Sequence, residues 1–160
     1  MLGRNIFRSL IFLPNVLSSI AVGLAFMLIL SPDKGPLNQF LASIGIDPPR
    51  WLGAVSTALP TIIMVSVWQT FGYYMILFLS GLQSIDSSLY EAAEMDGANA
   101  VRKFFAVTLP SLTPVLFFCV TIAIINAFKN IDQVFILTGG QMGGGPAGAT
   151  TVLVLDIYLN

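Results

Sequence analysis

Long charge-free stretches alternate with short polar segments along this chain. Residues 11–30, 51–85 and 104–128 contain no charged side chain. A helix needs about 20 apolar residues to cross a bilayer, and backbone exposed to lipid must satisfy its own hydrogen bonds. The pattern therefore predicts membrane helices at about 11–30, 59–80 and 104–128.

The polar segments between these stretches carry turn signals and charges. Residues 31–50 are rich in proline and glycine, with a short interfacial helix predicted at 37–44, and residues 86–103 hold six charges in a helical pattern. Residues 129–149 are read as a loop, glycine-rich at its end, and a fourth apolar run begins at 150–158. We expect one all-α, polytopic transmembrane domain over 1–160, with about four membrane helices.

Composition supports the membrane assignment and excludes several classes of function. Hydrophobic residues make up 56% of the chain and charged residues 9%, against about 25% charged in an ordinary soluble domain, so lipid is an expected partner. A net charge of −1 gives no reason to expect a nucleic-acid partner. There is no histidine and one cysteine, Cys119, inside an apolar run. We expect no metal site, no cofactor and no catalytic residue.

Polar side chains in the second and third predicted spans share helix faces. Ser66, Gln69, Thr70 and Tyr73 follow the spacing i, i+3, i+4, i+7, and Asn126 lies four residues before Asn130. Polar groups in a membrane helix are costly unless they face a cavity or a partner. They either line a path for a polar solute or form hydrogen bonds between neighbouring helices.

The distribution of basic residues only weakly favours one orientation of the chain across the membrane. With the N-terminus in the cytoplasm, the inside segments hold Arg4, Arg8, Arg102 and Lys103, and the outside segments hold three basic residues. The positive-inside rule then places residues 86–110 in the cytoplasm.

This predicted cytoplasmic loop carries a motif. Glu91-Ala92-Ala93 is followed after three residues by Gly97, and nine residues later by Val107-Thr108-Leu109-Pro110. The pattern resembles the EAA motif of the permease subunits of binding-protein-dependent ABC importers, with valine in place of the usual isoleucine. The resemblance also places the loop in the cytoplasm.

The residues of the loop predict its shape. Ser88 and Glu91 fit a capping box, which would start a short helix at about Ser88. Gly97 can adopt a positive φ and end that helix, and Asn99 can cap a second short helix that runs to about Val107. Ala92 and Ala93 leave room for another surface to approach.

The resemblance implies a role for each part of the loop. In the family, this element docks into a groove of the ATPase subunit, so the coupling residues here would be Glu91, Ala92, Ala93, Asp96, Gly97 and Pro110. Glu91 would pair with a basic group of the ATPase. The expected partners are a second permease subunit, ABC ATPase subunits and an extracytoplasmic solute-binding protein, at a bacterial cytoplasmic membrane.

The likeness covers nearly the whole chain and is greatest to the carbohydrate-type permeases (MalF/UgpA/LacF type). It rests on Arg8, Leu13-Pro14, Gly35-Pro36-Leu37-Asn38, Trp51-Leu52, Trp68, Leu82-Gln83-Ser84-Ile85, Thr138-Gly139-Gly140, Gly144-Gly145-Pro146 and Asp156-Ile157-Tyr158. It implies a sugar, polyol or glycerol-phosphate solute and contacts at Ser66, Gln69, Thr70, Tyr73, Asn126, Ala127 and Asn130.

The chain departs from the family pattern in two ways. Family members have six or more helices, so this chain reads as truncated at both ends, and the stretch 141–143 is interposed in the Thr-Gly-Gly-Gly-Pro signature. The glycine patch 139–145 lacks the lysine of a phosphate-binding loop, so any ATP hydrolysis belongs to a partner.

The alternative to a permease subunit is a transport-incompetent fragment that keeps only helix-packing contacts.

Overall fold

The computed structural model describes residues 2–32, 34–129, 131–138, 145–148 and 150. Its elements there are all helical: α1 (Leu2–Val16), α2 (Ser19–Ile29), α3 (Pro36–Ser43), α4 (Val55–Gln83), α5 (Ser87–Met95), α6 (Ala100–Lys103), the π-helix η1 (Phe104–Thr108), α7 (Leu109–Lys129), α8 (Ile131–Leu137) and the short 3₁₀-helix η2 (Pro146–Gly148). The all-α prediction is confirmed. The predicted fourth apolar run lies outside the described residues, apart from Thr150.

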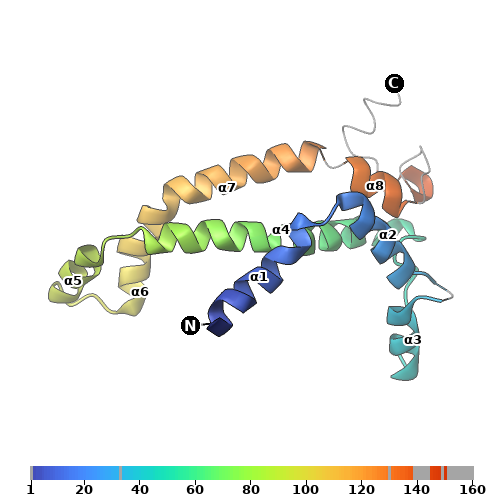
Figure 1. The fold of residues 1–160 in the computed structure, drawn as a ribbon, viewed down its shortest axis with the longest axis horizontal. Helices are drawn as coiled ribbons and strands as arrows, with labels where there is room; N and C mark the ends of the chain where they lie inside the picture. Colours follow the sequence, from blue (N-terminus) through green and yellow to red (C-terminus); the bar gives the residue numbers. More distant parts are fainter. Residues whose placement is uncertain (1, 33, 130, 139–144, 149, 151–160) are drawn as a thin grey trace.

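Helix α4 forms the long axis of the molecule (Figure 1). Helices α5 and α6 lie at its C-terminal end, α2, α3 and α8 lie towards its N-terminal end, and α7 runs beside it. Val55–Gln83 and Ala100–Phe128 are long and apolar enough to cross a membrane, and Ile6–Val16 with Ser19–Ile29 form a third candidate that is bent by 94°. The predicted spans at 59–80 and 104–128 are therefore confirmed with longer bounds.

The first predicted span is not one straight helix, so the prediction of a single helix over 11–30 is wrong. Pro14 lies inside α1 and cannot donate a backbone hydrogen bond. At the end of α1, the Leu17 amide bonds to the Pro14 carbonyl at 3.3 Å, and Ser18 adopts an extended ψ of 133°. The chain then turns through 94° into α2. We call residues 17–18 the elbow.

The stretch predicted as a loop over 129–149 begins with a helix instead. Val134 and Leu137 of α8 pack in a buried cluster with Val22 of α2 and with Ile62 and Val65 of α4. Seven residues are too few for periodicity alone to distinguish a helix from an apolar loop, so α8 depends on the surface that covers it. This cluster is the core where α2, α4 and α8 meet.

The short helix α3 confirms the prediction at 37–44, and a buried asparagine ties it to the turns on either side. The Asn38 amide donates to the Ser31 carbonyl at 3.1 Å, and its Oδ1 accepts from the Trp51 indole at 2.7 Å. Asn38 is only 4% exposed. Buried amides are kept where their hydrogen bonds are satisfied, so this side chain ties Ser31 and Trp51 to α3.

Two glycines of α4 allow its neighbours to approach closely. A Cβ on Gly72 would collide with the Ile11 carbonyl and lie 2.8 Å from the Phe12 Cα, and a Cβ on Gly81 would lie 2.9 Å from side chains of Leu112 and Val115 on α7. Small residues at crossings let membrane helices pack without a hydrophobic driving force. Gly72 therefore marks the crossing of α1 and α4.

Candidate functional site

The loop between α4 and α7 begins with an acidic N-cap. Asp86 precedes α5, and its carboxylate accepts a hydrogen bond from the Ser88 backbone amide at 2.9 Å. The predicted capping box with Ser88 as the N-cap is therefore wrong. The helix begins at Ser87, one residue earlier, because the carboxylate satisfies an amide that the first turn leaves free.

A Schellman motif ends α5. The Ala98 amide donates to the Ala93 carbonyl and the Gly97 amide to the Glu94 carbonyl, both at 2.9 Å. Gly97 has a φ of 71°, and a Cβ placed there would meet nothing within 4 Å. The predicted turn at Gly97 is confirmed, and glycine is favoured there by backbone conformation rather than by lack of space.

The second helix of the loop starts as predicted and continues differently. The Asn99 side chain accepts from the Arg102 amide at 2.9 Å and caps α6. Instead of a separate α-helix to about Val107, α6 ends at Lys103 and passes through η1 into α7. In η1 the Leu109 amide bonds to Phe104, five residues back. This wide turn directly precedes Pro110, which has no amide to donate to an α-helical turn.

Two side-chain contacts fix α5 relative to the helices that follow. The Lys103 ammonium forms an ion pair with the Glu94 carboxylate at 2.5 Å. The Tyr90 hydroxyl lies 2.9 Å from the buried Thr108 hydroxyl of η1. The first contact is solvent-exposed and contributes little to stability. The second joins the half-buried Tyr90 to the buried Thr108 and positions α5 against the start of α7.

Two carboxyl groups of the loop have shifted pKa values. The pKa of Asp86 is lowered because its charged form accepts hydrogen bonds from the Ser88 amide and hydroxyl. The pKa of Glu94 is lowered by its hydrogen bond to Lys103 and then by the charge of that ammonium. Both groups are solvent-exposed, so these pKa shifts come from local hydrogen bonds and charge rather than from burial.

The tip of the loop presents apolar and acidic groups to the outside. Met95 is 91% exposed and Val101 65% exposed. Of the predicted coupling residues, Glu91, Ala92, Asp96, Gly97 and Pro110 are exposed and Ala93 is half-buried. Glu91 to Gly97 are brought together on α5 and its turn, whereas Pro110 lies apart, at the start of α7.

The predicted polar face of α4 is present, but its members already have partners. Ser66 and Gln69 bond to Gln133 of α8, at 2.7 and 3.1 Å. The Thr70 hydroxyl donates to the Ser66 carbonyl, and the Tyr73 ring packs edge-on against Tyr74. Ser66, Thr70 and Tyr73 are half-buried and Gln69 is buried.

On α7, Asn126 is exposed, as is the neighbouring Ala127, while Asn130 lies outside the described residues. The sequence reading missed Gln133, which is 2% exposed. Its signal was present, because Asn126, Asn130 and Gln133 follow the helical spacing i, i+4, i+7.

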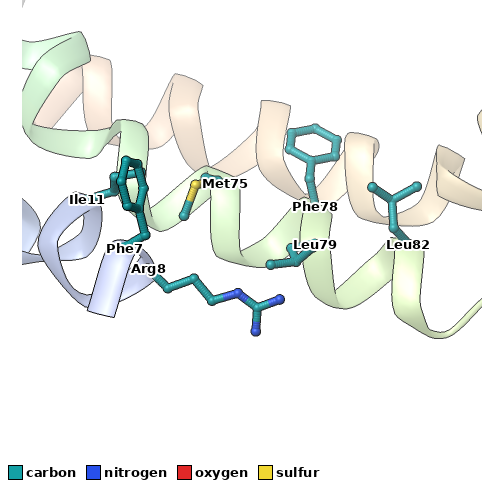
Figure 2. Close-up of a pocket in the computed structure, with 7 residues that line it drawn as sticks. All are labelled: Phe7, Arg8, Ile11, Met75, Phe78, Leu79 and Leu82. Atoms are coloured by element: carbon teal, nitrogen blue, oxygen red, sulfur yellow. The ribbon is translucent and has the colours of Figure 1, made fainter. Parts of the chain in front are cut away.

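An apolar cavity of about 450 Å³ separates α1 from the C-terminal half of α4 (Figure 2). It is lined by Phe7, Arg8 and Ile11 of α1 and by Met75, Phe78, Leu79 and Leu82 of α4. Figure 2 shows Met75 next to Ile11 and Phe7, and the Arg8 side chain extending away from these two residues. A second apolar cavity, of about 860 Å³, lies on the other side of the crossing, beside Trp68 and Phe71. Of the predicted solute-path residues that the structure describes, none lines either cavity.

The fold and these features define a class: a helical membrane protein with a capped two-helix loop at one end and a buried polar cluster between its helices. Comparisons with known proteins then define the family. Residues 2–158 match the model of the family described as "Binding-protein-dependent transport system inner membrane component". The chain belongs to this family, so the predicted resemblance is confirmed.

Several relatives match nearly the whole chain. It is 40% identical over 154 residues to the probable ABC transporter permease protein YurN of Bacillus subtilis, covering 95% of this chain and 51% of that protein. It is 36% identical to the trehalose/maltose transport system permease protein MalF of Thermococcus litoralis, covering 96% and 50%. Against the lactose transport system permease protein LacF of Rhizobium radiobacter it is 40% identical, covering 96% and 51%.

A solved structure supports the fold as well. A chain in the crystal structure of a bacterial ABC transporter that imports the acidic polysaccharide alginate matches with a TM-score of 0.71 and 28% identity, covering 98% of this chain and 54% of that one. The chain thus spans about half the length of the relatives it matches.

Proposed function

We propose that this chain is part of a transmembrane permease subunit of an ABC importer. Its solute is a sugar or a related polyol or glycerol phosphate, carried across a bacterial cytoplasmic membrane. Support comes from the family and from relatives named as trehalose/maltose, lactose and sn-glycerol-3-phosphate permease proteins. On this proposal the chain is not an enzyme, and its partners are a second permease subunit, ATPase subunits and an extracytoplasmic binding protein.

The capped, exposed loop of residues 86–110 is the observation that carries the proposal. An N-cap, a Schellman motif and the Tyr90–Thr108 hydrogen bond order the loop, and Met95 projects from it with 91% of its surface exposed. A large exposed apolar side chain within an ordered turn suits a protein interface. The loop would dock on the ATPase subunit, with Glu91 pairing with a basic group there.

Force can pass from this docking site to the membrane helices. Helix α6 continues through η1 into α7, and α7 packs against α4 at Gly81. Closure of the ATPase dimer on ATP would therefore move α7 and α4 together and shift the transporter between inward- and outward-facing states.

Solute-stimulated ATPase activity of the assembled transporter tests the coupling role. Glu91→Lys should abolish most of the stimulation while leaving membrane insertion and assembly intact, because it reverses the charge at the docking surface. Lys34→Glu, a charge reversal at an exposed residue outside the loop, is the control. Normal stimulation in Glu91→Lys would argue against docking. If stimulation requires sequence beyond this chain, the chain alone is the transport-incompetent fragment.

We propose that the solute path passes the polar face of α4 and the C-terminal end of α7. Its residues are Ser66, Gln69, Thr70, Tyr73, Asn126 and Asn130. Hydroxyl and amide groups next to aromatic rings suit the mixed polar and apolar surface of a sugar.

Uptake kinetics in proteoliposomes test this path. Asn126→Ala and Tyr73→Phe should raise the KM for the solute with assembly unchanged, whereas Thr121→Val should not. Thr121 is an exposed residue of α7 whose hydroxyl donates to the Phe117 carbonyl of its own helix. Unchanged kinetics in both path variants would favour hydrogen bonding between helices as the role of these groups.

A further inference from the structure

Three hydrogen bonds form a chain across α4. The Ser66 hydroxyl donates to Gln133 Oε1 at 2.7 Å, the Gln133 amide donates to Gln69 Oε1 at 3.1 Å, and the Gln69 amide donates to the Leu17 backbone carbonyl at 3.2 Å. Gln69 is 7% exposed and Gln133 2%. The chain therefore links α4 to α8 at one end and to the elbow at the other.

The last acceptor fixes the direction of the whole chain. A backbone carbonyl can only accept, so Gln69 must direct its NH₂ group to Leu17 and its oxygen to Gln133. Gln133 must then donate its NH₂ group to Gln69. This orientation directs the Gln133 oxygen to Ser66. The orientation of each amide thus follows from a single carbonyl at the elbow.

That carbonyl lies where regular helix stops. Leu17 directly follows α1, and the chain bends by 94° before α2. Farther along the hydrogen-bond chain, Gln133 is in the first turn of α8, just after α7 ends at Lys129. Irregular backbone at membrane depth is tolerated only where protein or a water-filled cavity supplies hydrogen-bond partners, and here Gln69 supplies one.

We propose that Ser66, Gln133 and Gln69 form a latch that holds α8 and the elbow against α4. Gln133 holds α8 through its two bonds to α4, and Gln69 holds the elbow through its bond to Leu17. The two arms can be distinguished, because replacement of Gln133 leaves the elbow bond in place, whereas replacement of Gln69 removes the elbow bond and one of the two bonds that Gln133 makes to α4.

Distances between spin labels test the two arms separately. One label pair, at Ile63 on α4 and Phe135 on α8, reports on the α8 arm, and a second pair, at Leu10 and Leu28, spans the elbow. All four positions are exposed. The assembled transporter is labelled in lipid nanodiscs without solute, in a Cys119→Ala background, so the outcome does not depend on the proposed solute path.

Each replacement should affect its own arm. Gln133→Met should broaden the Ile63–Phe135 distances and leave the elbow pair unchanged, whereas Gln69→Met should broaden the elbow pair most. Each hydrogen bond that is lost should raise the displaced population about threefold, which corresponds to the ~0.6 kcal/mol average of a membrane hydrogen bond. Thr121→Val, which removes a hydroxyl bonded within its own helix, should change neither distance.

A milder variant keeps the test decisive if a glutamine replacement prevents assembly. Ser66→Ala removes the Ser66–Gln133 bond and leaves the Gln133–Gln69 bond in place, so it should broaden the α4–α8 pair less than Gln133→Met does. Unchanged distances in all the variants that assemble, or equal broadening of both label pairs whichever residue is replaced, would overturn the latch.

Discussion

The Tyr90 hydroxyl lies 2.9 Å from the Thr108 hydroxyl and joins two segments that are 18 residues apart in the chain. Tyr90 is on α5 and Thr108 is the last residue of η1, directly before α7. Through this bond, the helix that carries the Glu-Ala-Ala sequence is tied to the membrane helix that follows it.

Removal of this bond should loosen α5. Tyr90→Phe and Thr108→Val should each lower stability by about 1 kcal/mol, because a partly buried hydroxyl loses its partner. The double variant should lose less than the sum of the two. Thermal unfolding of the assembled transporter measures all three, and strict additivity would show that the two hydroxyls do not interact.

Replacement of Gly97 should strain the end of α5. An L-residue in the left-handed region costs about 1–2 kcal/mol, and Gly97 has a φ of 71° with open space on the side where a Cβ would lie. Gly97→Ala should therefore reduce solute-stimulated ATPase activity, Gly97→Asn should do so less, and Gly97→Pro should abolish it, because the bond from the Gly97 amide to Glu94 is also lost.

Gly45 provides the matched control for this effect. It has a φ of 80° and is equally free of neighbouring atoms, but it follows α3, away from the loop. Gly45→Ala should cause similar local strain without loss of ATPase stimulation. Equal loss in Gly45→Ala and Gly97→Ala would mean that general destabilisation, not the angle of the loop, lowers the activity.

The loop should lose order in acid. Asp86 and Glu94 have pKa values below their ordinary values of 3.8 and 4.5. A carboxyl group with a lowered pKa in the folded state stabilises that state above its unfolded pKa, and the contribution is lost as pH falls through the folded pKa. Amide hydrogen exchange of α5, corrected for intrinsic rates, should therefore accelerate below about pH 4.

Asp86→Asn keeps a side-chain N-cap on α5 and removes the negative charge of the cap. Asparagine is also a good N-cap, so α5 should stay protected at neutral pH while losing the part of the acid response that Asp86 contributes. Glu94→Gln should remove the part that comes from the pair with Lys103. An acid response of unchanged size in the double variant would exclude both carboxylates as its source.

Any side chain at Gly72 should separate α1 from α4. Gly72→Ala places a Cβ against the Ile11 carbonyl, and overpacking typically costs about 1–3 kcal/mol. The melting temperature of the assembled transporter should fall accordingly. Gly53→Ala is the control, because its nearest atom, the Arg50 Cβ, is at 3.5 Å. Equal melting temperatures for the two variants would contradict a tight crossing at Gly72.

The sequence by itself determined the membrane class, the positions of α4 and α7, and most of the loop. Charge-free stretches of membrane-spanning length need no tertiary information to be read as helices. The cap at Asn99 and the turn at Gly97 depend on contacts within a few residues, so local chemistry was enough to predict them. The N-cap was placed two residues late because Asp86 and Ser88 are both good caps.

Only the tertiary structure decided where α1 and α2 part and how the polar groups pair. The elbow carbonyl at Leu17 finds its donor on Gln69, 52 residues away, and α8 is stable as a short helix because α2 and α4 cover it. Gln133 shares a helical spacing with Asn126, but its partners on α4 cannot be read from that spacing. Contacts of this range depend on how the helices cross, and those crossings are set by backbone contacts such as Gly72 against Ile11.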